Sequence, residues 1–326
     1  MKRCKLLELL RVEGLKIYFY TTVGAVKAVD NISFTLNQGE VLGLAGESGC
    51  GKSTTAFGII RLVPPPGRIV GGKIFFEGQD ILAMSPEEYR KKIRWKKISM
   101  VFQGAMNAFN PVLTIGDQLA EVFMIHRGLT KKEALMEAAK LLEMVGIDPR
   151  RVRSYPHELS GGMKQRAMIA MALALNPPLV IADEPTTALD VVVQAQVMNL
   201  FKKLQRERKI AVILITHDLS LIAEIADKVA IMYAGKIVEL GMSEHIYLNP
   251  YHPYTKGLLN SIPRIKGELK KLEWIPGVPP DLIRPPPGCR FHPRCKYRFE
   301  PCDKEEPPMI EIEKNHYVAC WLYVKR

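Results

Sequence analysis

A glycine-rich segment in the first quarter of the chain has the composition of a loop that binds phosphate. It matches the pattern G-x-x-x-x-G-K-[ST], follows the apolar run 41–45 and leads into a helix-compatible run. Backbone N–H groups in such a loop surround a phosphate, and the following helix directs its positive end at the anion. We therefore expect Lys52 to bridge the β- and γ-phosphates of ATP and Ser53 to ligate Mg²⁺. The predicted loop contains Gly46, Glu47, Ser48, Gly49, Cys50, Gly51, Lys52, Ser53 and Thr54.

Two adjacent carboxylates follow a second apolar run. Asp183 and Glu184 come directly after residues 179–182, which have the pattern of a buried strand. Asp183 is placed to hold Mg²⁺ through its water shell, and Glu184 to polarise an attacking water. Acidic pairs are common at strand ends, so this interpretation depends on the spacing of the pair from the segment 159–165 and on the segment 185–190 that follows.

Four of the six cysteines lie close together near the C-terminal end. The four, Cys289, Cys295, Cys302 and Cys320, are separated by five, six and seventeen residues. Four thiolates suit a [4Fe–4S] cluster or Zn²⁺, and free buried thiols are the structural alternative. Structural zinc sites usually have paired C-x₂₋₄-C knuckles, which are absent from this sequence, so the spacing favours an iron–sulfur cluster held by loops. Its predicted role is to fasten a proline-rich segment.

The elements that position these residues alternate between strand and helix patterns. Residues 6–45 have β-strand patterns at 12–20 and 29–36, and the stretch from about 117 to 145 is helical in composition. The alternation predicts an α/β fold with a parallel sheet. Buried strands are expected at 41–45, 179–182 and 211–215, and helices at 52–62, 161–175 and 191–208.

Composition and charge limit the class of protein. The 326 residues are 47% hydrophobic and 25% charged, which is typical of a globular chain. No run approaches the length of a membrane span, and charged residues interrupt the N-terminal segment, so we expect a protein made and kept in the cytoplasm. The net charge is +12, and the densest basic cluster lies at 90–97. That cluster is either a solvated helix face or a site of attraction to an anionic membrane or nucleic acid.

The segment 159–165 (LSGGMKQ) resembles the LSGGQ-type signature of ABC ATPases, with Met163 in place of the usual glutamine. Together with the phosphate-binding loop, it identifies a P-loop ABC nucleotide-binding domain. The resemblance implies a parallel-sheet core, an antiparallel β subdomain and a helical signature subdomain. It also implies that the signature of one subunit closes over the nucleotide bound by another, so the chain should work as a pair. The signature residues expected to act in trans are Ser160, Gly161, Gly162, Met163, Lys164 and Gln165.

The same resemblance assigns further residues of the ATP site. His217 is similar to the switch histidine that contacts the γ-phosphate, and Asp190 to the D-loop aspartate. Gln103 resembles the glutamine that begins the mobile helical region and reaches Mg²⁺ and the water. An aromatic residue upstream normally stacks on adenine. Among residues 18–20 we favour Phe19, while simple packing of all three aromatic rings is the alternative.

The segment 249–259 (NPYHPYTKGLL) and the cysteine segment 289–295 (CRFHPRC) are more specific. They resemble the ATPase subunits of dipeptide and oligopeptide importers, of the D type. This implies a peripheral location on the cytoplasmic face of the membrane, two membrane-spanning permeases, a second and different ATPase as heterodimer partner, an extracytoplasmic solute-binding protein and no nucleic-acid partner. Residues 1–248 would form the ATP-binding domain, with its helical subdomain at about 104–160, and 249–326 a proline-rich regulatory or cluster-binding extension.

Other cargoes and other functions remain as alternatives. Relatives within the importer family carry nickel or oligosaccharides instead of peptides. DNA-repair ATPases of the ABC type separate the two motifs with long coiled coils, and the intervening stretch here is short, without sustained heptads. Translation-factor ATPases usually carry two cassettes in one chain, whereas this sequence contains one copy of each motif.

Overall fold

The computed structural model describes residues 7–104, 108–187, 189–261 and 275–324. Contacts between residues divide the chain into two compact units. The first unit contains Met1–Asn37, Val41–Leu82 and Thr216–Arg326, and the second contains Gln38–Glu40 and Ala83–Ile215.

An antiparallel sheet begins the first unit. Its strands β1 (Glu8–Thr21), β2 (Gly24–Asn37), β4 (Gly67–Phe76) and β5 (Gln79–Asp80) lie in the order β2-β1-β4-β5. The two β-strand patterns predicted within residues 6–45 correspond to β1 and β2. Buried apolar side chains on β1, such as Val12 and Ile17, are 1% and 0% exposed, as expected for strands with one face on the core.

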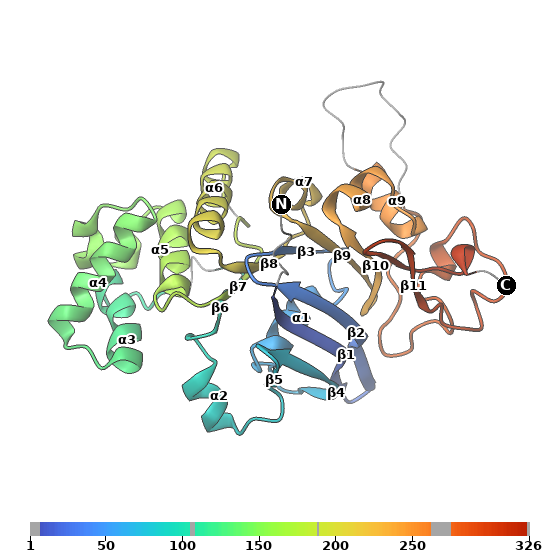
Figure 1. Ribbon diagram of the computed structural model, residues 1–326, viewed down its shortest axis with the longest axis horizontal. Coiled ribbons are helices and arrows are strands. Elements are labelled where there is room, and N and C mark those ends of the chain that lie inside the picture. Colours follow the sequence, from blue (N-terminus) through green and yellow to red (C-terminus); the bar gives the residue numbers. More distant parts are fainter. Residues whose placement is uncertain (1–6, 105–107, 188, 262–274, 325–326) are drawn as a thin grey trace. The chain divides into compact units, whose positions relative to one another are not determined.

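A second set of strands in the first unit leads to the phosphate-binding loop. The strand β3 (Val41–Ala45) is buried at all five positions and pairs in parallel with β9 (Lys228–Tyr233). Next come β10 (Lys236–Met242), β12 (His316–Ala319) and β11 (Met309–Glu313), each antiparallel to its neighbour. The chain's C-terminal part therefore extends the same group of strands as β3 (Figure 1).

The helices of the first unit are short. They are α1 (Lys52–Ile59), α7 (Leu219–Ile225), α8 (Ser243–Leu248) and α9 (Pro253–Asn260). Gly43 of β3 lies against α7, since a Cβ there would be 2.3 Å from a side-chain methyl of Ile222. Between residues 275 and 324 the helical elements are the 3₁₀ helices His292–Arg294 and Trp321–Tyr323, as the proline content predicts.

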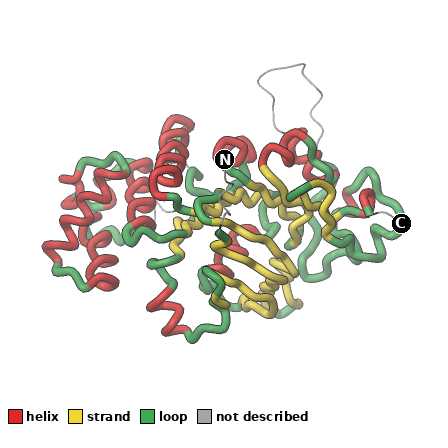
Figure 2. Tube along the Cα trace, viewed as in Figure 1, coloured by secondary structure: helices red, strands yellow, loops and turns green. Residues whose placement is uncertain are grey.

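The second unit combines three parallel strands with most of the longer helices. The strands β8 (Ala211–Ile215), β7 (Leu179–Asp183) and β6 (Ile98–Val101) lie in this order. The helices are α2 (Pro86–Lys92), α3 (Ile115–Arg127), α4 (Lys131–Met144), α5 (Gly161–Leu173) and α6 (Val191–Arg208), with 3₁₀ helices at Pro149–Arg153 and Pro156–Glu158. Figure 2 shows the helices α3, α4 and α5 as neighbours in the unit.

The helical stretch predicted at about 117–145 forms two helices. Gly128 ends α3 in the left-handed conformation, with φ of 67°. Thr130 then begins α4 with a capping box, in which the Glu133 N–H donates to the Thr130 hydroxyl and the Glu133 carboxylate accepts the Thr130 N–H. The stretch predicted as helical therefore forms two helices that contact each other.

The basic cluster at 90–97 begins on α2. Lys91 and Lys92 form i,i+4 ion pairs of 2.6 Å with Glu87 and Glu88. These pairs agree with the interpretation of a solvated helix face. None of the helices in the described parts of the chain has the length and apolar character to cross a membrane.

Candidate functional site

The phosphate-binding loop joins β3 to α1 in the first unit. Gly46 and Gly51 have φ of 148° and 105°, and a Cβ would lie 2.1 Å from the Met232 carbonyl oxygen at the first position and 2.2 Å from that of Ala28 at the second. A side chain at either position is therefore excluded by backbone atoms. Lys52, 7% exposed, turns its ammonium group back into the loop and donates to the carbonyl oxygens of Gly46 (2.7 Å) and Glu47 (3.0 Å).

Cys50 is a buried thiol in this loop. Its Sγ lies 3.6 Å from the Lys52 ammonium nitrogen. Burial raises the pKa of Cys50, and the nearby lysine offsets this only in part. A position at a helix N-terminus can lower a thiol pKa, but here desolvation is the larger effect. Cys50 is therefore a small protonated side chain that fills the loop.

The two carboxylates predicted to hold Mg²⁺ (Asp183) and to polarise water (Glu184) lie at the end of β7 in the second unit. Asp183 is 2% exposed. Glu184 follows with a positive φ of 45°, and its N–H donates to the Ile215 carbonyl oxygen of β8 at 2.8 Å. The positive φ follows the last residue of the strand, Asp183.

Gln103 lies beside Glu184, although the two are 81 residues apart in the sequence. The Gln103 Nε2 donates to Oε2 of Glu184 at 2.9 Å, and the Thr187 hydroxyl donates to the same oxygen at 2.9 Å. The residues predicted to be catalytic are Lys52, Gln103, Glu184 and His217, and the structure brings Gln103 and Glu184 together. The contact between Thr187 and Glu184 was not predicted from the sequence. The position of Thr187 three residues after Glu184 was the available signal.

The signature segment begins α5. The Ser160 hydroxyl accepts the Met163 N–H at 3.3 Å, so Ser160 is the N-cap that its type and position predict. Gly162 packs against α6, where a Cβ would be 2.5 Å from a methyl group of Val193. Gln165 is 4% exposed. Gly161, Met163 and Lys164 complete the first turn of the helix.

The remaining predicted site residues lie at helix starts and on β1. Asp190 caps α6 by accepting the Val193 N–H at 2.9 Å. His217 lies between β8 and α7, next to Asp218, which caps α7. Phe19 is half-buried, with its ring against Gly67, where a Cβ would be 2.6 Å away.

The flanking aromatic residues differ from Phe19 in their surroundings. The Tyr18 hydroxyl donates to Asp30 at 2.8 Å, whereas Tyr20 is 49% exposed. The first unit thus contains the loop, Phe19 and His217. The second contains Gln103, Asp183, Glu184 and the signature.

Within the first unit, residues of the C-terminal part are joined to β10 through buried polar contacts. The Glu239 carboxylate, 0% exposed, accepts from His316 Nε2 (2.9 Å) and from the backbone N–H groups of Tyr251 (2.7 Å) and His252 (3.0 Å). Burial lowers the pKa of His252 to about 4, so the ring stays neutral and its Nδ1 accepts the Tyr254 N–H at 3.1 Å. These contacts join β10 to α9 and β12.

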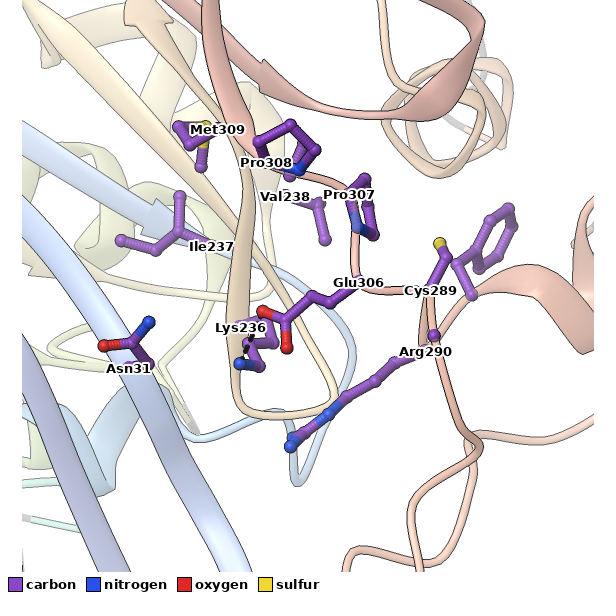
Figure 3. Close-up of a pocket in the computed structure, with 13 residues that line it drawn as sticks. Asn31, Lys236, Ile237, Val238, Cys289, Arg290, Glu306, Pro307, Pro308 and Met309 are labelled. Carbon is purple, nitrogen blue, oxygen red and sulfur yellow. Dashed lines mark hydrogen bonds and ion pairs between the residues drawn. The ribbon is translucent and has the colours of Figure 1, made fainter. Parts of the chain in front are cut away.

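A pocket marks the junction between β10 and the residues that follow the cysteine segment. Ile237 and Val238 line one side, and Pro307 and Pro308 line the other. Figure 3 shows the Glu306 carboxylate directed at Lys236, with which it forms an ion pair of 2.7 Å. Arg290 nearby binds Asp30 and the Ala234 carbonyl oxygen.

The four C-terminal cysteines are free thiols. Among the described residues, no three of their Sγ atoms lie within 4.8 Å of one another, and the group that meets this limit is His245, Glu313 and His316. Burial raises the pKa of Cys289 to about 11 and that of Cys320 to about 12. Cys295 and Cys302 add to the rise at Cys289, and the other three cysteines of the group add to the rise at Cys320. The iron–sulfur cluster therefore stays a prediction.

The phosphate-binding loop, the signature segment and the carboxylates at the end of β7 define a class of protein. The profile of the ABC transporter family matches residues 29–187. MJ0796, a bacterial ABC transporter cassette whose dimeric structure is known, has a TM-score of 0.65 and 29% identity, covering 72% of this chain and 99% of that chain. CbiO1 from Clostridium perfringens has a TM-score of 0.64 and 26% identity, covering 74% of this chain and 91% of that chain. The protein is an ABC-type ATPase.

A more specific family follows from full-length relatives. The profile described as oligopeptide/dipeptide transporter, C-terminal region, matches residues 238–302. The dipeptide transport ATP-binding protein DppD of Bacillus subtilis is 48% identical, over 98% of this chain and 96% of that protein. The oligopeptide transport ATP-binding protein OppD of Escherichia coli is 48% identical, over 96% and 93%. The chain belongs to this family of ABC transporter ATP-binding subunits.

Proposed function

We propose that this chain hydrolyses ATP to drive the import of dipeptides or oligopeptides. The observation that carries the proposal is similarity to peptide transport ATP-binding proteins along nearly the whole chain, including the C-terminal region that a general ABC cassette lacks. Importers of nickel or oligosaccharides are the alternative within the same family.

The proposed ATP chemistry assigns one task to each group. Lys52 and the loop amides bind the phosphates, and Phe19 stacks on adenine. Ser53, Asp183 and Gln103 would hold Mg²⁺, and the ion would supply positive charge that neutralises the phosphates. Glu184 orients and polarises the attacking water, and His217 contacts the γ-phosphate. The hydrogen bond between Gln103 and Glu184 supports this assignment, because it places the amide beside the proposed base.

The proposed partners follow from the family. The chain would bind two permease subunits at the cytoplasmic face of the membrane, form a heterodimer with a related ATPase, and act with an extracytoplasmic solute-binding protein. The dimeric structure of the related cassette MJ0796 supports the pairing of cassettes. Residues 1–248 would supply the ATPase and 249–326 the family-specific extension.

Reconstituted transport tests the cargo. We expect the complete complex in vesicles to hydrolyse ATP faster when its binding protein carries a short peptide, and to accumulate that peptide. The same vesicles given nickel or an oligosaccharide are the control. Accumulation of either of these, with none of the peptide, would reassign the cargo within the family and contradict the proposal.

The four cysteines are proposed to hold one [4Fe–4S] cluster, with Zn²⁺ as the alternative. Four thiolates at about 2.3 Å from a single zinc ion lie within about 4 Å of one another, closer than the separations in this structure allow for any three of the four. In a [4Fe–4S] cluster each thiolate binds a different iron, so the cysteine sulfurs lie farther apart than in a zinc site.

Metal analysis of anaerobically purified protein tests this proposal. We expect a brown protein with about four irons per chain. Changing any one of the four cysteines to serine should remove the iron and expose residues 249–326 to proteolysis, since the cluster would fasten a segment with few apolar contacts. Cys50→Ser, which lies outside the group, is the matched control and should keep the iron. Stoichiometric zinc without iron would contradict the cluster.

A further inference from the structure

An arginine of the cysteine segment contacts the phosphate-binding loop. Arg294, the last residue of the 3₁₀ helix His292–Arg294, donates from Nη1 to Glu47 Oε2 at 2.8 Å and from Nη2 to Glu47 Oε1 at 3.0 Å. This is a bidentate ion pair between residues 247 positions apart, and such paired bonds are stronger and more directional than single ones. The Arg294 and Glu47 side chains are 6% and 25% exposed. Solvent therefore screens this pair only in part.

The contact is held in place from the arginine side. Arg294 Nε donates to the Pro276 carbonyl oxygen at 2.8 Å, and Nη1 also reaches the Tyr233 hydroxyl at 3.3 Å. The Tyr233 ring packs on Tyr254 (4.6 Å between centroids) and on Phe291 (5.2 Å). The Pro276 carbonyl oxygen and the packed Tyr233 side chain therefore hold the guanidinium of Arg294 in one orientation.

Glu47 is held at its backbone as well. Its N–H donates to the Tyr254 hydroxyl at 2.8 Å, and its carbonyl oxygen accepts from the Lys52 ammonium at 3.0 Å. One loop residue is therefore joined to the extension through Arg294 and Tyr254, and to the lysine expected to bind the phosphates.

We propose that Arg294 is a positioning residue that neutralises Glu47 and fixes the loop for a triphosphate. Without Arg294 the loop would present an unpaired carboxylate next to the binding site of a highly negative ligand, and the two would repel each other. The inference rests on the proposed role of the loop in binding ATP. It makes the extension part of the nucleotide site.

The location of Arg294 gives this contact a second consequence. The residue lies between Cys289 and Cys295, and the Arg294 N–H donates to the Phe291 carbonyl oxygen within the same turn. A change in the fold of the cysteine segment therefore moves the guanidinium away from Glu47. Nucleotide affinity then depends on the integrity of the C-terminal segment.

A charge-swap series with direct nucleotide binding tests the proposal, using full-length protein and fluorescent ATP and ADP. Arg294→Met should weaken ATP binding by about tenfold. The reason is that the Glu47 carboxylate would keep about one uncompensated negative charge in a partly buried site beside the phosphates. The loss should be larger for ATP than for ADP, because ATP has the greater negative charge. Adding Glu47→Gln to Arg294→Met should restore most of the affinity. Arg290→Ala is the matched control, since Arg290 is equally buried in the same segment but binds Asp30.

The outcomes separate the possible explanations. Equal loss in Arg294→Met and Arg290→Ala, with no rescue by Glu47→Gln, would mean that the arginine only stabilises the extension, and would overturn the proposal. Unchanged ATP affinity in Arg294→Met would overturn it as well. Lys52→Ala reports on the proposed function independently: if this variant binds ATP as tightly as the unmodified protein, the loop assignment itself is wrong.

Discussion

Replacing Glu184 with glutamine should leave ATP bound but reduce its hydrolysis by at least about 100-fold, the usual contribution of a positioned general base. The substitution keeps the shape of the side chain and its acceptor for the Gln103 and Thr187 hydrogen bonds, each 2.9 Å long in the structure. It removes the negative charge that would draw a proton from water. Chemistry should therefore stop while binding continues.

Steady-state phosphate release and gel filtration with ATP measure the two effects. Bound ATP that is not hydrolysed should hold paired cassettes together, so the variant should elute as a larger species with ATP than without it. Glu207→Gln on the exposed face of α6 is the matched control and should change neither property. Turnover close to that of the unmodified protein would remove Glu184 from the role of base.

The parts of the fold that could be predicted from the sequence are those determined by neighbouring residues, such as apolar runs, helix caps and loop glycines. The apolar runs of β3, of residues 179–182 in β7 and of β8 are buried at every position, and such runs are typical of strands covered on both faces. The bounds predicted for α6 agree with the structure, since Asp190 caps its first turn and Lys209 ends it in the left-handed conformation. The need for glycine in the phosphate-binding loop was likewise predictable, because a side chain at Gly46 or Gly51 would collide with the backbone of Met232 or Ala28.

The parts that were not predictable depend on contacts between distant residues. Nothing local to Glu47 or Arg294 indicates that they pair, because their proximity results from the packing of Tyr233, Tyr254 and Phe291. The position of Gln103 was known only by resemblance, and its bond to Glu184 required the parallel pairing of β6 with β7. The sequence shows that four cysteines could act as ligands, but their spacing along the chain does not determine the distances between their sulfur atoms.

The chain alone should hydrolyse ATP slowly or not at all, and its partner subunits should restore the activity. The sequence has one phosphate-binding loop and one signature, and the family resemblance implies that each loop needs the signature of another subunit. The exposed Ser160 at the start of α5 is consistent with a surface that meets a ligand held elsewhere. Activity of the purified chain should therefore be close to background and should rise on addition of the second ATPase with the permeases.

A signature variant makes this test specific. Ser160→Arg adds a bulky cation where the partner's nucleotide would lie, so it should block the restored activity while leaving ATP binding to this chain's own loop unchanged. Its matched control is Ser160→Thr, which retains a capping hydroxyl and should support restoration. A purified monomer whose rate per molecule is high and independent of concentration would show that each loop works without a second signature. In that case the two motifs would have to serve one chain, and the paired mechanism would be wrong for this protein.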